Sequence, residues 1–138
     1  MNVIVLGCGR VGSELASLLD SHEHSVTVLD VSQSSFMKLP QSFKGRALLG
    51  NGLDPETLIK AGIDKAEAFI AVTQNDNKNI MAAEIAKHIF GVPHVLCRTY
   101  DPNRSEVFEA SGIITLSPTL LIAGLFVDAL LDSVKEAE

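Results

Sequence analysis

The chain has 138 residues, which is enough for one domain with a buried core. Its net charge of −6 argues against nucleic acids and anionic membrane surfaces as main partners, because both call for clustered Lys and Arg. With only two cysteines, the chain can form neither a disulfide framework nor a four-cysteine metal site.

Six short apolar runs predict β-strands, at residues 2–6, 25–30, 46–49, 68–72, 94–98 and 113–116. The runs VIVL, SVTVL, AFIAV and HVLC are almost entirely apolar, which is typical of parallel strands that are covered on both faces. Met1 leads directly into the first run, without the basic segment or cleavage site of a signal peptide. We therefore expect a cytoplasmic protein.

Helical segments alternate with these strands. After the first strand, Val11, Leu15, Leu18 and Leu19 recur at helical spacing. Three later helices are each predicted by a capping side chain followed by proline, at residues 54–55, 101–102 and 117–118.

One further helix is expected over residues 77–90, before Gly91 and Pro93. Its apolar residues Met81, Ile85 and Ile89 are spaced to face inward.

This alternation predicts an α/β fold, a Rossmann-type doubly wound parallel six-stranded sheet in the order 3-2-1-4-5-6. In that order the sheet reverses between its first and fourth strands, and ligands bind outside the carboxyl ends of the strands at such a point. The glycine-rich residues 7–12 and the polar loop 73–77 should therefore face one crevice.

The glycine-rich segment after the first strand has the pattern G-x-G-x-x-G, at Gly7, Gly9 and Gly12. In a dinucleotide site these residues permit a tight turn, the approach of a pyrophosphate to the backbone, and close helix–strand packing. Asp30 ends the second strand 18 residues after Gly12, where an acid would bind both ribose hydroxyls and repel a 2′-phosphate. NAD(H) or an unphosphorylated adenine nucleotide is therefore favoured over NADP(H), and Val31 is placed in the same site.

Arg10 and Val11 lie inside the glycine pattern. The Arg10 guanidinium could fold over the phosphates, since a cation at a helix N-terminus opposes the helix dipole and an anionic partner would explain its presence. The alternative is a solvated arginine at a helix start.

Three later loops supply further candidates. Asn51 and Gly52 follow the third strand, where the Asn51 amide would suit the adenine edge, although a plain glycine-rich turn explains them equally well. Thr73 would face the second phosphate or the distal half of the ligand, or else only cap a helix, and helix capping is the better explanation for Asn75 and Asp76.

Arg98 ends an apolar strand, a costly place for a charge without a partner. It calls for a ligand phosphate, a carboxylate of a partner subunit, or a local salt bridge such as one to Asp101.

Several other reactive residue types suggest no chemistry. His22 and His24 lie in a turn at the opposite end of the sheet, so we predict a solvated turn there and no metal site. Cys8 has no His or Asp nearby in sequence to activate it and is expected to fill space, and Cys97 is expected in the core. No catalytic residues are predicted.

The last helix is apolar around most of its circumference, from Leu120 to Leu131. This apolar segment is too short to span a bilayer and contains Asp128, so direct membrane insertion is not expected. A symmetric homodimer would bury the excess apolar surface, and burial within the chain's own domain is the alternative.

These motifs together resemble the RCK (KTN, or TrkA N-terminal) domain family of potassium channels and Trk/Ktr-type transporters. The resemblance covers essentially the whole chain and rests on GCGRVG, the acid of VTVLD, GNGLDPETLIKAGIDKAEAFIAVTQNDNKN, CRTYDPN and GIITLSP. The chain departs from the family at Asn51, where Asp is common, and this leaves the choice among NAD, ADP and ATP open.

The resemblance implies a nucleotide-binding domain at residues 1–117 and a crossover or dimerisation helix at residues 118–138. It further implies a regulatory subunit that forms dimers or rings, lies at the inner face of the membrane through a membrane-embedded potassium transporter or channel, and gates ion flow when NAD(H), ADP or ATP binds. The family's second ligand-binding lobe is not in this sequence, which could come from a truncated chain or a minimal subunit. The alternative function is a small NAD-dependent oxidoreductase, in which Tyr100 would have to act alone.

Overall fold

In the computed structural model, which describes residues 1–101 and 111–137, six parallel strands form one sheet in the order β3-β2-β1-β4-β5-β6. The predicted Rossmann-type strand order is thus confirmed. The strands are β1 (Asn2–Leu6), β2 (Ser25–Asp30), β3 (Arg46–Leu49), β4 (Ala68–Ala71), β5 (His94–Arg98) and β6 (Ile114–Leu116). The helices are α1 (Arg10–Ser21), η1 (Gln33–Lys38), α2 (Pro55–Lys60), η2 (Ile63–Lys65), α3 (Asp76–Glu84), η3 (Ile85–Ile89) and α5 (Pro118–Ala137).

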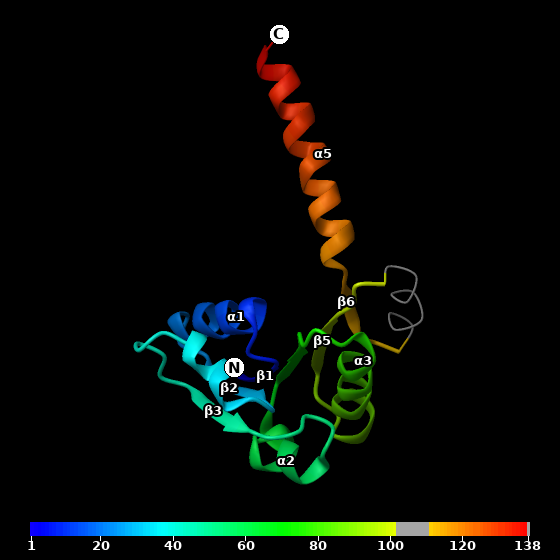
Figure 1. Cartoon of the computed structure of the whole chain (residues 1–138). Helices are drawn as coiled ribbons and strands as arrows, with labels where there is room; N and C mark the ends of the chain where they lie inside the picture. Colours follow the sequence, from blue (N-terminus) through cyan, green and yellow to red (C-terminus); the bar gives the residue numbers. More distant parts are fainter. Residues whose placement is uncertain (102–110, 138) are drawn as a thin grey trace.

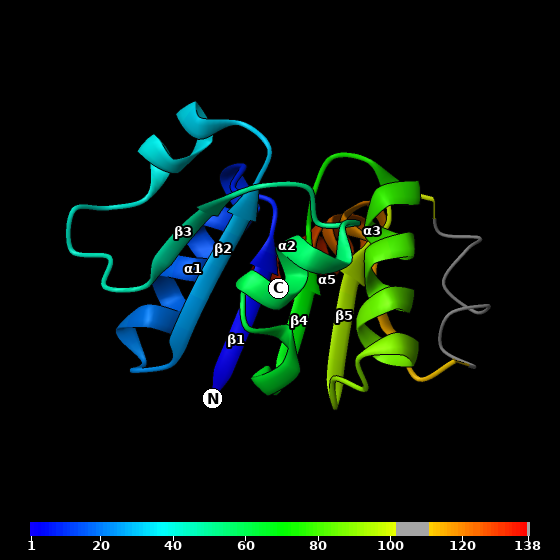
Figure 2. The same ribbon diagram turned by 90° about the horizontal axis from the view of Figure 1, so that it is seen from below.

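The sheet has a core on each face, because successive strand side chains point to opposite sides. Val3, Val5, Val26 and Val28 pack with Ala16 of α1. The opposite face packs against α2 and α3 through Ile4, Leu6, Leu29, Phe69, Leu58 and Ala82. In Figure 2 α1 lies behind the sheet, while α2 and α3 lie in front of it.

Two strand ends differ by one residue from the prediction. β4 ends at Ala71 rather than Val72, although the Val72 N–H still donates to Leu6 O at 2.9 Å. β6 begins at Ile114, because the turn at Ser111 and Gly112, where Gly112 adopts a φ of +86°, lies just before it.

The predicted inward face of the helix at residues 77–90 is wrong in part. Met81 is 53% exposed and Ile89 69% exposed, and only Ile85 packs against the core. The buried stripe consists instead of Asn79, Ala82, Ala83 and Ala86. Small side chains let α3 approach β4 and β5 closely, and a π-helical turn at Ile85–Ile89 adds a residue that shifts the face of the last turn.

The predicted proline-led helices at residues 55 and 118 are present as α2 and α5, and the one at residues 101–102 lies outside the described residues. α5 projects away from the sheet as a single helix that ends near the C-terminus (Figure 1). None of its residues is buried, and its large apolar side chains are between 50% and 72% exposed. Among the described helices, none is both long and apolar enough to cross a membrane.

Candidate functional site

A cleft of about 580 Å³ opens at the carboxyl ends of the strands, around the point between β1 and β4 where the strand order reverses. Seven of the residues predicted from the sequence line it: Gly7, Gly9, Arg10, Val11, Asp30, Thr73 and Arg98. The strand order thus places four separate chain segments around one cavity.

The glycine loop between β1 and α1 is shaped by close backbone contacts. Gly7 has a φ of +107°, and a Cβ there would lie 3.0 Å from Thr73 N. A Cβ on Gly12 would collide with the carbonyl oxygen of Gly7, so this position permits the tight contact between loop and helix. A Cβ on Gly9, by contrast, would meet nothing within 4 Å, so the space above Gly9 is open to the cleft.

The N-terminus of α1 faces this cleft. Gly9 caps the helix without a side-chain hydrogen bond, and the first turn contains no acidic residue. The first backbone N–H groups of the helix and the Arg10 side chain therefore present positive charge to the cleft. This arrangement suits an anionic group such as a phosphate.

Asp30 connects the end of β2 to the glycine loop. Its Oδ2 accepts a hydrogen bond from Cys8 N at 2.8 Å, and its Oδ1 accepts one from Ser32 N at 2.9 Å. A carboxylate oxygen can accept more than one hydrogen bond, so Asp30 can still accept from ligand hydroxyl groups.

Cys8 is fully buried below this loop, and its pKa is raised mainly by burial and also by the Asp30 charge, while Lys38 acts in the opposite direction. The thiol therefore stays protonated, as expected for a residue that fills space. Cys97 is likewise buried in the core, as predicted.

Asn79 joins the loop after β4 to the end of β5. This fully buried side chain accepts hydrogen bonds from Thr73 N (2.9 Å) and Thr73 Oγ1 (2.6 Å) at its Oδ1, and its Nδ2 donates to Thr73 O (2.9 Å) and Arg98 O (3.0 Å). Two residues of the cleft are thus held by one amide of α3, and the sequence analysis did not single out Asn79.

Arg98 is 9% exposed and has partners that the sequence analysis did not consider. Its Nη2 donates to the carbonyl oxygens of Val72 and Thr73, both at 2.8 Å, and its guanidinium lies 5.0 Å from the centre of the Tyr100 ring. Its buried Nε has no hydrogen-bond partner within the described residues. The charge is therefore held at the cleft wall with donor capacity left over.

The capping interpretation is confirmed for Asn75 and is wrong for Asp76, whose side chain bonds residues after β5 instead. The Asn75 side chain accepts from Lys78 N at 3.0 Å and caps α3. The Asp76 carboxylate accepts from Tyr100 N at 2.9 Å and from Thr99 Oγ1 at 3.1 Å, which ties the start of α3 to the residues after β5.

Four of the predicted residues do not line the main cleft, and one of them, Gly12, packs against Gly7 as described above. Asn51 accepts from Leu53 N at 3.0 Å within its own turn, and a Cβ on Gly52 would collide with the Leu6 side chain, so this loop is shaped by local packing. Val31 lines a small adjoining cavity of about 100 Å³, together with Asp30 and Thr73.

Five residues of the cleft were not named as ligand candidates, although the loop 73–77 was predicted to face it: Ser35, Lys38, Val72, Gln74 and Tyr100. Val72 and Gln74 flank Thr73, and Tyr100 lies two residues after Arg98, so these three are close in sequence to predicted site residues. Ser35 and Lys38 lie on the short helix η1, which no apolar periodicity in the sequence predicts.

In the predicted histidine turn, His24 Nδ1 lies 2.9 Å from the Met1 amino group and His22 Nδ1 lies 2.7 Å from Leu18 O. Within residues 1–101 and 111–137, His, Cys, Asp and Glu form no group of three or more that could hold a metal ion.

The strand order, the glycine loop that leads into α1, and an acid at the end of β2 define a domain of the Rossmann dinucleotide-binding class. Residues 3–117 match the model of the TrkA-N domain. The chain belongs to the TrkA-N domain family.

A Trk system potassium uptake protein TrkA from Streptomyces coelicolor is 45% identical over 136 residues. The match covers 99% of this chain and 61% of that relative, so the chain spans about three fifths of the relative's length.

Solved structures agree on the fold. The TrkA-N domain of the inner membrane protein ybaL from Escherichia coli has a TM-score of 0.83 and 21% identity, and covers 94% of this chain and 96% of its own. The GsuK channel bound to NAD has a TM-score of 0.80 and 22% identity, over 96% of this chain and 23% of its own. GsuK bound to ADP has a TM-score of 0.78 and 23% identity, over 94% of this chain and 33% of its own.

Proposed function

We propose that the chain is a nucleotide-sensing regulatory domain of a potassium transport system. It would bind NAD(H) or ADP/ATP in the cleft, shift the conformation of a homodimer, and so gate a membrane-embedded potassium transporter or channel. The potassium uptake protein among its relatives and the NAD-bound and ADP-bound forms of GsuK support this proposal.

In this proposal residues 1–117 hold the nucleotide and residues 118–138 join two copies. Dimers would associate further into a ring, and the protein would lie in the cytoplasm at the inner face of the membrane through its transporter partner.

The observation that carries the proposal is that the polar cleft shares a wall with an apolar groove. The groove measures about 460 Å³ and is bounded by α1, the sheet and the first turns of α5. Val11, Val72 and Arg98 line both cavities. A nucleotide that moves these residues would change the surface next to α5, which is how a binding event would bias one dimer geometry over another.

The groove would be filled by a second copy of the chain. Leu121, Ile122 and Leu125 line its α5 side, and each is more than half exposed in the single chain. Apolar side chains in such number on one helix favour burial against another apolar surface. The same chain offers both surfaces, as a symmetric dimer needs.

Regulation is favoured over hydride-transfer catalysis because the polar side chains of the cleft are already engaged in contacts within the protein. Asp30 accepts from two backbone N–H groups, Arg98 donates to two backbone carbonyls, and Tyr100 lies over the Arg98 guanidinium. These contacts fix the shape of the cleft, so we propose that the chain is not an enzyme.

The nucleotide is tested by calorimetric titration with NAD, NADH, ADP, ATP and NADP. We expect NADP to bind most weakly, because its 2′-phosphate would lie against the Asp30 carboxylate. Asp30→Ala should weaken NAD binding at least about thirtyfold, since a hydrogen bond to a charged group contributes about 2 kcal/mol.

The control is Glu14→Ala, which removes an exposed acid of α1 outside the cleft and should leave affinity unchanged. Asp30→Asn separates the charge of Asp30 from its hydrogen bonds to the loop, because an amide oxygen can still accept from Cys8 N and Ser32 N. This variant should reduce the discrimination between NAD and NADP. Tightest binding of NADP to the wild type would overturn the role assigned to Asp30.

Gly9→Ala should separate ligand binding from folding. Its φ of −81° suits alanine and a Cβ there meets no atom within 4 Å, so the free energy of unfolding should change by less than about 1 kcal/mol. The methyl group would occupy the path of the phosphates, and NAD affinity should fall about tenfold or more.

Gly7→Ala is the matched comparison, because its φ of +107° and contacts at 3.0–3.1 Å should make it destabilising. Denaturant unfolding and calorimetry measure both quantities. Wild-type affinity in Gly9→Ala would mean that no phosphate passes over this residue.

A further inference from the structure

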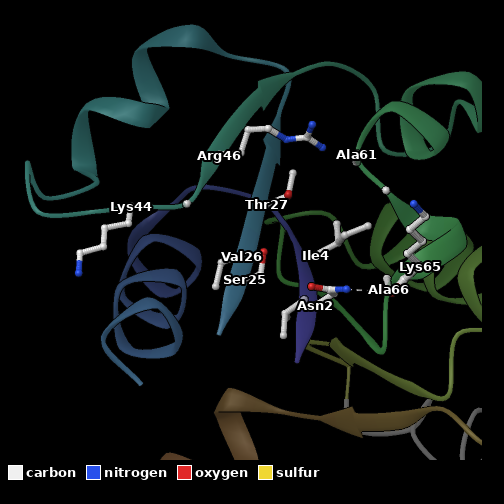
Figure 3. Close-up of a pocket in the computed structure, with 13 residues that line it drawn as sticks. Asn2, Ile4, Ser25, Val26, Thr27, Lys44, Arg46, Ala61, Lys65 and Ala66 are labelled. Atoms are coloured by element: carbon white, nitrogen blue, oxygen red, sulfur yellow. Dashed lines mark hydrogen bonds between the residues drawn. The ribbon is translucent and has the colours of Figure 1, made fainter. Parts of the chain in front are cut away.

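A second polar cleft lies at the opposite end of the sheet from the glycine loop. It measures about 410 Å³ and is bounded by the first residues of β1, β2 and β3 and by the chain from Ala61 to Ala66 (Figure 3). Its residues are distinct from those of the nucleotide-type cleft.

The cleft exists because the connection between β2 and β3 contains only the short helix η1. Phe36 of η1 and Leu39 and Phe43 after it pack on the α1 side of the sheet. In Figure 2 α2 lies in front of β1 and β4, and among the described residues no helix lies in front of β2 and β3. That uncovered area is polar where the strands begin, with Ser25 and Thr27 on the side opposite to Val26.

Two cations approach this polar floor from different elements. Arg46, the first residue of β3, extends over Thr27 toward Ala61, and Lys65 of η2 lies on that same side of the cleft (Figure 3). Arg46 Nη2 donates to Lys60 O at 2.8 Å, which fixes the guanidinium while its other donors remain available. Lys44 lies at the outer edge and points away in the same view.

The charges here are not balanced within the described part of the chain. Neither Arg46 nor Lys65 has a carboxylate oxygen within 4 Å among those residues. The carboxylate of Glu67 accepts from Asn2 N at 3.2 Å, at the β1 side of the cleft. In a chain with a net charge of −6, an uncompensated pair of cations on a hydroxyl-bearing floor favours an anion at the Arg46 end.

We propose that this cleft binds a small phosphate-bearing anion, independently of the nucleotide. The Arg46 guanidinium would bind two phosphate oxygens as a fork, Lys65 would supply a second charge, and the Thr27 hydroxyl would donate a hydrogen bond. The volume of about 410 Å³ is that of a small-molecule site. The ligand would be inorganic phosphate or a small phosphate monoester.

The test is a titration of the full ¹⁵N-labelled chain with inorganic phosphate, followed by NMR at constant ionic strength, with a parallel titration with glycerol 3-phosphate. We expect saturable shifts of the Thr27, Arg46 and Lys65 amides at a Kd on the order of 1 mM. The amides of Gly9 and Arg10 report separately on phosphate in the other cleft. Tighter binding of one probe identifies free phosphate or a monoester as the better ligand class.

Arg46→Gln and Lys65→Gln should each weaken phosphate binding, as measured by these shifts, about tenfold or more, since each removes a charged donor. Lys60→Gln is the control, because it removes a neighbouring positive charge that lies outside the cleft lining. Saturation that is unchanged in the Arg46→Gln, Lys65→Gln double variant, shifts that grow linearly without saturation, or shifts confined to Gly9 and Arg10 would each overturn the proposal.

Discussion

Replacing Asn79 with alanine is expected to lower the free energy of unfolding by about 3 kcal/mol, and the melting temperature by about 10 °C. The Asn79 side chain is fully buried and takes part in four hydrogen bonds with Thr73 and Arg98. Its removal leaves a small cavity and takes the acceptor from the partly buried Thr73 N–H, and each such loss costs on the order of 1–3 kcal/mol. Denaturant unfolding measures the change.

The same variant should bind nucleotide at least about tenfold more weakly at temperatures where it is folded, because Thr73 and Arg98 both line the cleft. Asn75→Ala is the matched control on the same helix. Asn75 is an exposed cap, so its loss should cost about 1 kcal/mol and leave affinity nearly unchanged. Equal effects of the two substitutions would show that Asn79 does not organise the cleft.

The sheet could be predicted from local sequence because its strands are apolar on both faces. Four of the six strands have the predicted bounds, and the reversal of strand order correctly predicts that the glycine loop and Thr73 face one cleft. Helix faces were harder to predict. Large apolar residues suggested Met81 and Ile89 as part of the inner face of the helix at residues 77–90. A close helix–sheet contact needs alanine instead, and it accepts a buried asparagine when hydrogen bonds satisfy it.

The sequence predicted those parts of the site that have a local pattern, and it did not predict contacts between distant residues. The glycine spacing and Asp30 carry a local signature, so they were found. The partners of Arg98 are backbone carbonyls 25 and 26 residues away, and a backbone carbonyl has no signature in a sequence. Lys38 reaches the cleft only because η1 folds back after β2, and no apolar pattern predicts that path.

α5 combines two apolar surfaces with different neighbours. Leu121, Ile122 and Leu125 border the groove beside α1 and the sheet. Farther along, Phe126, Leu130 and Val134 recur at intervals of four residues and form a second stripe, which no element of the single chain covers within the described residues. One helix can therefore fill the groove of a partner and meet the partner's helix at the same time.

Leu130→Asp should convert the proposed dimer to a monomer at micromolar concentration. Leu130 is 63% exposed in the single chain, so the substitution should leave the domain folded. In a symmetric dimer the carboxylate is buried twice, at a cost of at least about 4 kcal/mol, which raises the dimer Kd about a thousandfold. Light scattering measures the mass, and the melting temperature reports on the fold.

The control is Lys135→Asp, which changes the charge of the same helix by two units at a position on its polar side, beside Asp128 and Asp132. It should remain a dimer, because charges there stay in water. A wild-type chain that is monomeric at tens of micromolar, or a Leu130→Asp variant that stays dimeric, would contradict the proposal that a second copy fills the groove. Regulation through dimer geometry would then need a different interface. Nucleotide binding in the cleft would be unaffected, because the calorimetric titration tests it separately.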